Sequence, residues 1–161
     1  MIRAVLFDRD GTLIADDPSH ARAVTLMPYA REAVELLRNR GVRIGVVSNQ
    51  PAARDDELTR VHREIEDALG ALDGWFICRH VPAAGCDCRK PQPGLVLEAA
   101  RRFGMEPHEC AVIGDIGSDV EAAQRAGACA VLVPTEKTLH PEIASAPAVS
   151  TNLLDAVERL L

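Results

Sequence analysis

The sequence predicts an α/β fold: a doubly wound, Rossmann-like sheet of five parallel strands with helices on both faces. Short apolar runs alternate with amphipathic segments of helical period along nearly the whole chain, and this alternation is typical of successive βαβ units. The connections are short, so right-handed crossovers are expected. At 161 residues, 47% of them apolar, the chain can bury one core, and we expect residues 1–161 to form a single domain.

The helices and strands can be placed by their apolar period and by the glycines and prolines at their ends. Pro28 and Pro93 are expected to start two helices, and Gly41 and Gly104 to stop them. A polar loop at residues 16–25 follows the first strand, and a proline-punctuated stretch precedes the last helix. The expected strands cover residues 5–7, 42–47, 74–77, 110–113 and 129–133, and the expected helices cover residues 29–38, 55–69, 93–104, 118–126 and 153–161.

The composition argues against nucleic acids and membranes as partners. The chain has 18 basic and 24 acidic residues, a net charge of −6, which disfavours a general surface for polyanions or anionic lipid. Aromatic residues make up only 3% of the chain, too few for a base-stacking platform. No apolar run is long enough to span a bilayer, and the chain enters a strand at once rather than a signal peptide. We therefore expect a cytoplasmic protein with a small polar substrate.

The first apolar run ends in two carboxylates, Asp8 and Asp10, followed by Gly11 and Thr12. Because parallel strands end at one edge of their sheet, where open α/β folds bind ligands, both carboxylates are expected there. Two close carboxylates are not both stable as anions unless a cation lies between them or one keeps a proton. Since Asp-x-Asp-Gly alone is also typical of a turn, the prediction of chemistry depends on the residues at the ends of the other strands.

Polar residues follow the second, third and fourth expected strands as well, in a fixed order along the chain. They are Ser48 and Asn49, then Lys90 and Pro91, then Gly114 and Asp115 with Asp119. Four such motifs at consecutive strand ends are hard to explain as turns. Their ordered combination resembles the haloacid dehalogenase (HAD) superfamily of phosphotransferases, and the resemblance covers nearly the whole chain.

This resemblance implies a Mg²⁺-dependent phosphomonoester hydrolase that works through an aspartyl phosphate on Asp8. Mg²⁺ prefers carboxylate and phosphate oxygens, and its implied ligands are Asp8, the backbone carbonyl of Asp10 and Asp115, with Asp119 behind them. Asp10 would protonate the leaving alkoxide and later take a proton from the attacking water. The remaining implied roles are phosphoryl binding by Ser48 and Asn49 and charge neutralisation by Lys90.

Four soft metal ligands crowd into the loop after the third expected strand: Cys78, His80, Cys86 and Cys88. This cluster favours a closed, tetrahedral, structural Zn²⁺ site, and the alternative is a pair of buried thiols with a surface histidine. Arg89 and Lys90 follow the last of the four directly, so a bound metal would fix the loop that presents both cations.

The other two cysteines, Cys110 and Cys129, lie in apolar runs, so we expect both in the core. Five cysteines is an odd number, and a cytoplasmic chain has reducing surroundings. A disulfide framework is therefore not expected.

The zinc loop and the lack of room for an inserted cap domain narrow the resemblance to the D-glycero-D-manno-heptose 1,7-bisphosphate phosphatases and the related histidinol-phosphate phosphatases. By this resemblance Asp16 and Arg89 would bind the sugar and its second phosphate, and Gln50 would contact the substrate. We favour removal of the 7-phosphate of the heptose bisphosphate, because Arg89 offers bidentate capture of a second phosphate. Histidinol phosphate is the alternative substrate.

A function of another class also remains open. A phospho-receiver signalling domain also uses an acidic cluster, Mg²⁺ and a lysine on a doubly wound sheet, but it is not a hydrolase. Receivers place their acceptor aspartate after a middle strand of the chain, whereas Asp8 follows the first, and they have no zinc loop. Because an open site for a small substrate needs no second subunit, we expect a monomer.

Overall fold

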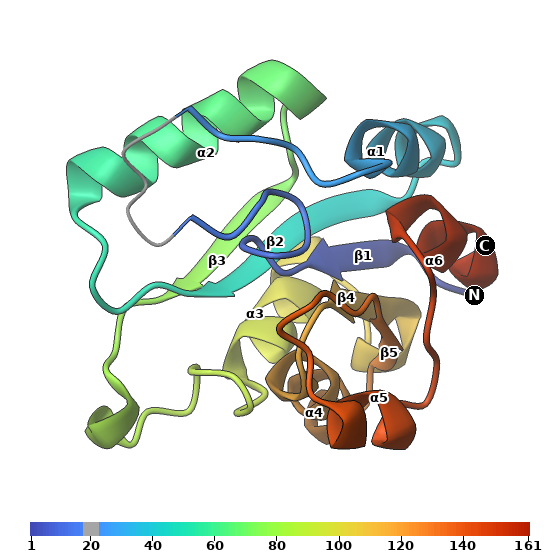
Figure 1. Cartoon of the computed structure of the whole chain (residues 1–161). Helices are drawn as coiled ribbons and strands as arrows, with labels where there is room; N and C mark the ends of the chain where they lie inside the picture. The colour runs from blue at the N-terminus through green and yellow to red at the C-terminus, as the bar shows by residue number, and fades with distance from the viewer. Residues whose placement is uncertain (18–22) are drawn as a thin grey trace.

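The computed structural model describes residues 1–17 and 23–161. At its centre lies a five-stranded parallel sheet with the strand order β3-β2-β1-β4-β5 (Figure 1). The fold class expected from the sequence is therefore confirmed. The strands are β1 (Ala4–Phe7), β2 (Arg43–Asn49), β3 (Gly74–Cys78), β4 (Cys110–Gly114) and β5 (Cys129–Leu132).

Helices cover both faces of the sheet, as Figure 1 shows. Side chains of β1 alternate between the two cores: Val5 and Phe7 pack with α1, α2 and α6, whereas Leu6 packs with α3 and α4, as the period of two along a strand requires. Within the described part of the chain, no helix has the length and apolar character needed to cross a bilayer. The helices named here are α1 (Ala30–Asn39), α2 (Asp55–Leu69), α3 (Gly94–Phe103), α4 (Gly117–Ala126) and α6 (Leu153–Leu160).

Most element boundaries lie within a few residues of those expected, but two features near prolines differ. Helix α1 begins at Ala30, and Tyr29 before it adopts a left-handed conformation with φ of 63°, so Pro28 lies outside the helix. A further helix, α5 (His140–Ser145), occupies part of the proline-punctuated stretch. Pro141 lies in its first turn, where a proline removes no intrahelical hydrogen bond, so this proline did not exclude a helix.

The expectation that both strand cysteines lie in the core is wrong for one of them. Cys110 is buried, but Cys129 is exposed. Cys129 is the first residue of β5, and β5 is an edge strand of the sheet. An edge strand has a neighbouring strand on one side only, so its first residue is less covered than residues of the inner strands. The apolar run therefore predicted the strand correctly, but its first residue is exposed rather than buried.

The sheet order places a topological switch between β1 and β4. The chain runs from β1 outward through β2 to β3, and then returns to the other side of β1 to form β4 and β5. Crossovers that leave a central pair of strands in opposite directions open a crevice at the carboxyl ends of that pair, where open α/β folds bind ligands. The polar loop expected at residues 16–25 lies partly outside the described residues, since 18–22 are not among them.

Candidate active site

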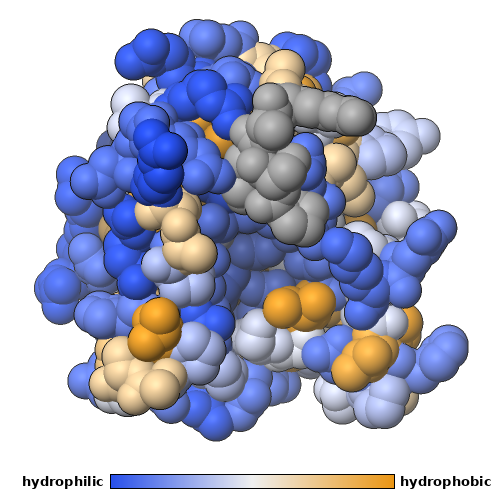
Figure 2. Space-filling model, turned by 60° about the vertical axis from the view of Figure 1, so that its left-hand side comes forward, coloured by the Kyte–Doolittle hydropathy of each residue, from blue (hydrophilic) through white to orange (hydrophobic). Residues whose placement is uncertain are grey.

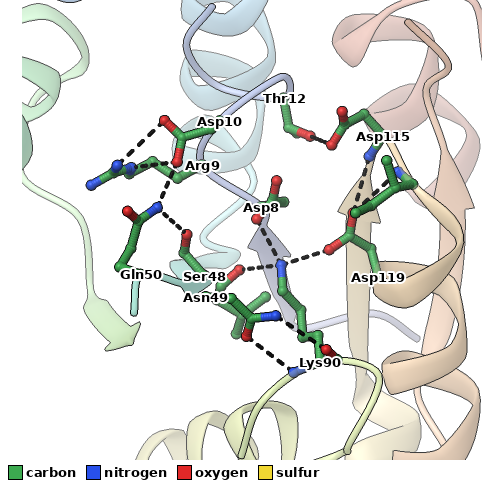
Figure 3. A network of polar contacts seen from close by, with 12 residues as sticks. Asp8, Arg9, Asp10, Thr12, Ser48, Asn49, Gln50, Lys90, Asp115 and Asp119 are labelled. Atoms are coloured by element: carbon green, nitrogen blue, oxygen red, sulfur yellow. Dashed lines mark hydrogen bonds and ion pairs between the residues drawn. The ribbon is translucent and has the colours of Figure 1, made fainter. Parts of the chain in front are cut away.

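The predicted catalytic residues meet at this switch point. Asp8 follows β1, Ser48 lies near the end of β2, and Asp115 follows β4. Lys90 reaches the same place from the loop between β3 and α3. Figure 3 shows these side chains converging at the carboxyl ends of the strands. Residues far apart in sequence are thus brought together because their strands are adjacent and parallel.

Lys90 is the centre of this polar network. Its Nζ donates to Asp8 Oδ1 at 2.6 Å, to Asp119 Oδ1 at 2.6 Å and to the carbonyl oxygen of Val47 at 2.8 Å. Its side chain is only 3% exposed. Burial opposes its charge, but the carboxylates of Asp119 and Asp8 outweigh burial and hold the pKa of the ammonium above its ordinary value. Lys90 is therefore a fixed positive charge directly beside Asp8.

Asp8, Asp115 and Asp119 form a buried carboxylate cluster, with one oxygen of each within 4.8 Å of the others. Burial raises the pKa of Asp8 to about 8, although Lys90 lowers it and Asp119 and Asp115 raise it further. Burial and the neighbouring Asp119 raise the pKa of Asp115 to about 6. One lysine does not offset three buried carboxylates, and a divalent cation with oxygen ligands would. The residues present therefore fit Mg²⁺.

The approach of Asp119 to this cluster depends on a glycine. Asp119 lies in the first turn of α4, and its Oδ2 accepts from the backbone amides of Asp115 and Ile116 at 3.2 Å each. A Cβ at Gly114 would lie 2.3 Å from Asp119 Cγ, so only glycine fits there. Thr138 also donates to the carbonyl oxygen of Asp115 at 2.6 Å, which ties the loop after β5 to the cluster.

Asp10 lies apart from the lysine and forms its own contacts. Its Oδ2 accepts from Arg9 Nε at 2.9 Å and from Gln50 Nε2 at 2.6 Å, and its Oδ1 accepts from Arg9 Nη2 at 3.3 Å. Arg9 is 1% exposed. Sequence reasoning passed over Arg9 as the variable residue of Asp-x-Asp. A basic residue between two carboxylates at the end of a buried strand was the signal that could have identified it, because such a charge needs a partner.

The three polar residues after Val47 have different partners. The Ser48 hydroxyl is buried and accepts from Gln50 Nε2 at 3.0 Å. The Asn49 side chain donates from Nδ2 to the carbonyl oxygen of Lys90 at 3.1 Å and accepts from the Lys90 amide at 3.0 Å. Asn49 thereby holds the backbone of Lys90, and Gln50 links Ser48 to Asp10.

The four predicted zinc ligands also come together. Cys78 Sγ lies 3.8 Å from Cys86 Sγ and 3.3 Å from Cys88 Sγ, and the two thiols of Cys86 and Cys88 lie 3.6 Å apart. His80 Nδ1 lies 3.5 Å from Cys78 Sγ and 3.2 Å from Cys88 Sγ. A tetrahedral zinc with Zn–S bonds of about 2.3 Å has S···S edges of about 3.8 Å. The spacing of these donors therefore fits a tetrahedral Zn²⁺.

The two residues predicted to bind the non-reacting part of the substrate have different surroundings. Arg89 follows the cysteine cluster, donates to the carbonyl oxygen of His80 at 3.2 Å, and with Lys90 lines a hollow of about 220 Å³. Asp16 forms an exposed ion pair with Lys137 at 2.6 Å. Figure 2 shows mostly polar residues on the surface around the hollowed centre of this view. The structure does not bring Asp16 and Arg89 into contact.

Comparison with known proteins finds a matching family model and matching relatives. The family described as HAD-hydrolase-like matches residues 87–160. A D-glycero-beta-D-manno-heptose-1,7-bisphosphate 7-phosphatase of Bordetella bronchiseptica is 30% identical over 146 residues, which are 83% of this chain and 82% of the relative. A D-glycero-alpha-D-manno-heptose-1,7-bisphosphate 7-phosphatase of Mycobacterium bovis is 35% identical over 78% of this chain and 76% of the relative.

A solved structure with a similar fold is the D,D-heptose 1,7-bisphosphate phosphatase of B. bronchiseptica complexed with magnesium and phosphate. It superimposes with a TM-score of 0.86 at 25% identity, over 99% of this chain and 98% of the other. A HAD-like phosphatase of Mesorhizobium loti has a TM-score of 0.76, also at 25% identity, over 99% of this chain and 87% of the other. These similarities extend over the whole sheet and its helices.

Proposed function

Because this chain belongs to the HAD-like phosphatases, within the family of D-glycero-D-manno-heptose-1,7-bisphosphate 7-phosphatases, it is a phosphatase, and we propose that it removes the 7-phosphate of a heptose 1,7-bisphosphate. A small phosphorylated sugar is therefore its substrate class. The observation that supports this most directly is Asp8 held 2.6 Å from Lys90 beside two further carboxylates at a sheet edge. A phosphate monoester dianion can approach an aspartate only where cations offset the repulsion.

In the proposed reaction a carboxylate oxygen of Asp8 attacks phosphorus, and the bond from phosphorus to the sugar oxygen breaks. Asp10 transfers its proton to that leaving oxygen, so the sugar departs as an alcohol. A water then gives a proton to Asp10 and attacks the aspartyl phosphate, which releases inorganic phosphate and restores the Asp8 carboxylate. Lys90 offsets the negative charge that develops on the phosphoryl oxygens in both halves.

The proposed cofactors follow from the two donor clusters. Mg²⁺ would be held by Asp8, the backbone carbonyl of Asp10 and Asp115, with Asp119 behind them, and would supply positive charge to the phosphoryl oxygens. Asp119 would also hold the ammonium of Lys90 through their ion pair. A structural Zn²⁺ held by the cluster of Cys78, His80, Cys86 and Cys88 would order the loop that leads into Arg89 and Lys90.

Substrate contacts are proposed from the position of the polar groups around Asp8. Because the Ser48 hydroxyl accepts a hydrogen bond from Gln50, its own proton is free to be donated to a phosphoryl oxygen. Arg89 and Lys90 line the same hollow, but the Lys90 ammonium is directed at Asp8 and Asp119. The Arg89 guanidinium would therefore bind the second phosphate of a bisphosphate there. Asp16, which is paired with Lys137, would accept hydrogen bonds from sugar hydroxyls.

The test is phosphate release in the presence of Mg²⁺ from both anomers of the heptose 1,7-bisphosphate and from histidinol phosphate, with Asp8→Asn as the blank. We expect the bisphosphate to exceed histidinol phosphate by orders of magnitude in kcat/KM, and Arg89→Ala to remove most of that preference. A preference for histidinol phosphate would contradict the substrate and leave the reaction intact. Asp8 that becomes phosphorylated without turnover would indicate a receiver instead.

The monomeric state, the single-domain organisation and the cytoplasmic location stay predictions from the sequence. Size-exclusion chromatography with light scattering would test the first of these directly. A stable dimer whose contacts cover the hollow beside Arg89 would contradict the open site proposed here.

A further inference from the structure

Gln50 lies where a substrate-binding residue was expected, but its amide is already engaged. Nε2 donates to Asp10 Oδ2 at 2.6 Å and to Ser48 Oγ at 3.0 Å, and the residue is 8% exposed. Its backbone amide donates to the carbonyl oxygen of Cys78 at 2.7 Å, which continues the pairing of β2 with β3. The side chain therefore extends from a fixed piece of backbone.

Arg9 completes the surroundings of the same carboxylate. Together Arg9 and Gln50 direct three N–H groups at the two oxygens of Asp10, and both donor residues are buried. Figure 3 shows the Asp10 carboxylate pointing toward Arg9 and Gln50 and away from Lys90. A carboxylate held by three donors from two rigid sites has lost most of its freedom to rotate.

We propose that Gln50, together with Arg9, is a positioning residue that fixes the carboxylate of Asp10 for proton transfer to the leaving oxygen. This inference rests on the proposed phosphatase function. In-line displacement puts the attacking and leaving oxygens on opposite sides of phosphorus, so the proton donor must stand apart from Asp8. The contacts with Arg9 and Gln50 hold Asp10 apart from the Asp8–Lys90 pair in this way. Gln50 thereby acts on the leaving group without touching it.

A purely structural role for Gln50 gives a different pattern of activities. If Gln50 only tied the loop after β1 to β2, its loss would lower activity toward every phosphate ester by a similar factor. A loss of proton transfer is selective, because a sugar alkoxide needs protonation to leave, whereas p-nitrophenolate leaves readily as an anion. The ratio of kcat/KM for these two substrates distinguishes a structural role from a role in proton transfer, because each kcat/KM reports on the steps up to release of the alcohol or phenol.

The experiment compares Gln50→Met with the wild-type protein on the heptose bisphosphate and on p-nitrophenyl phosphate, with Mg²⁺ and zinc present. Methionine keeps the length of the side chain and removes its donors. We expect kcat/KM for the sugar phosphate to fall at least about tenfold more than that for p-nitrophenyl phosphate. Asn49→Leu is the matched control, because Asn49 holds the backbone of Lys90 instead, and it should lower both values by the same factor.

A double variant tests whether Gln50 acts through Asp10. In an Asp10→Asn background, Gln50→Met should leave the ratio unchanged, since the proton donor is already absent. Equal losses for both substrates in Gln50→Met, or an unchanged sugar phosphate rate, would overturn the inference. If Gln50→Met does not fold, Gln50→Leu gives the same comparison, because it also lacks the amide donors and places no charge beside Asp10. A wild-type protein that hydrolyses neither ester would contradict the proposed function itself.

Discussion

Removing the charge of the proposed nucleophile should stabilise the Mg²⁺-free protein. The perturbation is Asp8→Asn, which keeps the shape of the side chain and removes one of three buried carboxylates. The pKa of Asp8 is raised from 3.8 to about 8, chiefly by burial. A carboxyl whose pKa is raised on folding favours the protonated form in the folded state. The wild-type fold therefore loses stability as pH rises from about 4 to about 8, and the variant lacks that loss.

The size of the effect follows from the displacement of the pKa. One pKa unit corresponds to about 1.4 kcal/mol, so a displacement of about four units sets an upper limit of about 6 kcal/mol. Water at the open edge of the sheet screens part of this free energy. We therefore expect Asp8→Asn to be more stable than the wild-type protein by about 2–4 kcal/mol at pH 8, or roughly 5–15 °C in Tm. Near pH 4 the two proteins should be alike.

The assay is thermal unfolding from pH 4 to pH 8.5 in Mg²⁺-free buffer without chelator, so that any zinc is retained. Added Mg²⁺ should raise the Tm of the wild-type protein at pH 8, because it binds only the folded cluster, and should raise that of Asp8→Asn less. Asp10→Asn is the control, and it should destabilise, because it removes the ion pair of the buried Arg9. A wild-type protein at least as stable as Asp8→Asn at pH 8 would refute the reasoning.

Three further outcomes are expected. Lys90→Met should lower kcat/KM at least about 100-fold and destabilise the protein by about 3 kcal/mol or more, since two buried ion pairs are lost. Lys137→Met removes an exposed ion pair and should leave the free energy of unfolding nearly unchanged; equal stability losses in urea would contradict this. Cys88→Ser should lower zinc content and kcat/KM while Mg²⁺ affinity, measured by calorimetry, stays the same, and a zinc-poor protein of full activity would be evidence against the proposed role of the loop. Gly114→Ala should destabilise by at least about 2 kcal/mol in urea, because its Cβ would overlap Asp119, and a neutral result would show that the first turn of α4 can move.

Much of the fold follows from local pattern. A period of two residues indicates a strand and a period of 3.6 a helix, so α2 was expected at residues 55–69 and lies at Asp55–Leu69. Helix α5 was missed because a short helix with proline in its first turn has the composition of a loop. The burial of Cys129 was misjudged because an apolar run does not tell which strand ends at the edge of the sheet.

Which residues meet at the candidate site was also predictable from residue types and their order. Carboxylates, a lysine and hydroxyl or amide groups at four consecutive strand ends predicted the set of Asp8, Ser48, Lys90 and Asp115 from the sequence alone. Parallel strands make this possible, because they all end at the same edge. The cysteine and histidine cluster was predictable for a simpler reason: its ligands lie within 11 residues of one another.

By itself, the sequence determined which residues reach the active edge of the sheet, and the tertiary structure decided what each of them contacts there. The contact between Gln50 Nε2 and Asp10 Oδ2 at 2.6 Å joins residues 40 positions apart, and Arg9 is paired with the same carboxylate; neither contact could be read from the sequence. Periodicity assigns a side chain to a face or an end of an element. Its hydrogen-bond partner depends on the order and register of the strands and on side-chain direction, which long-range packing sets.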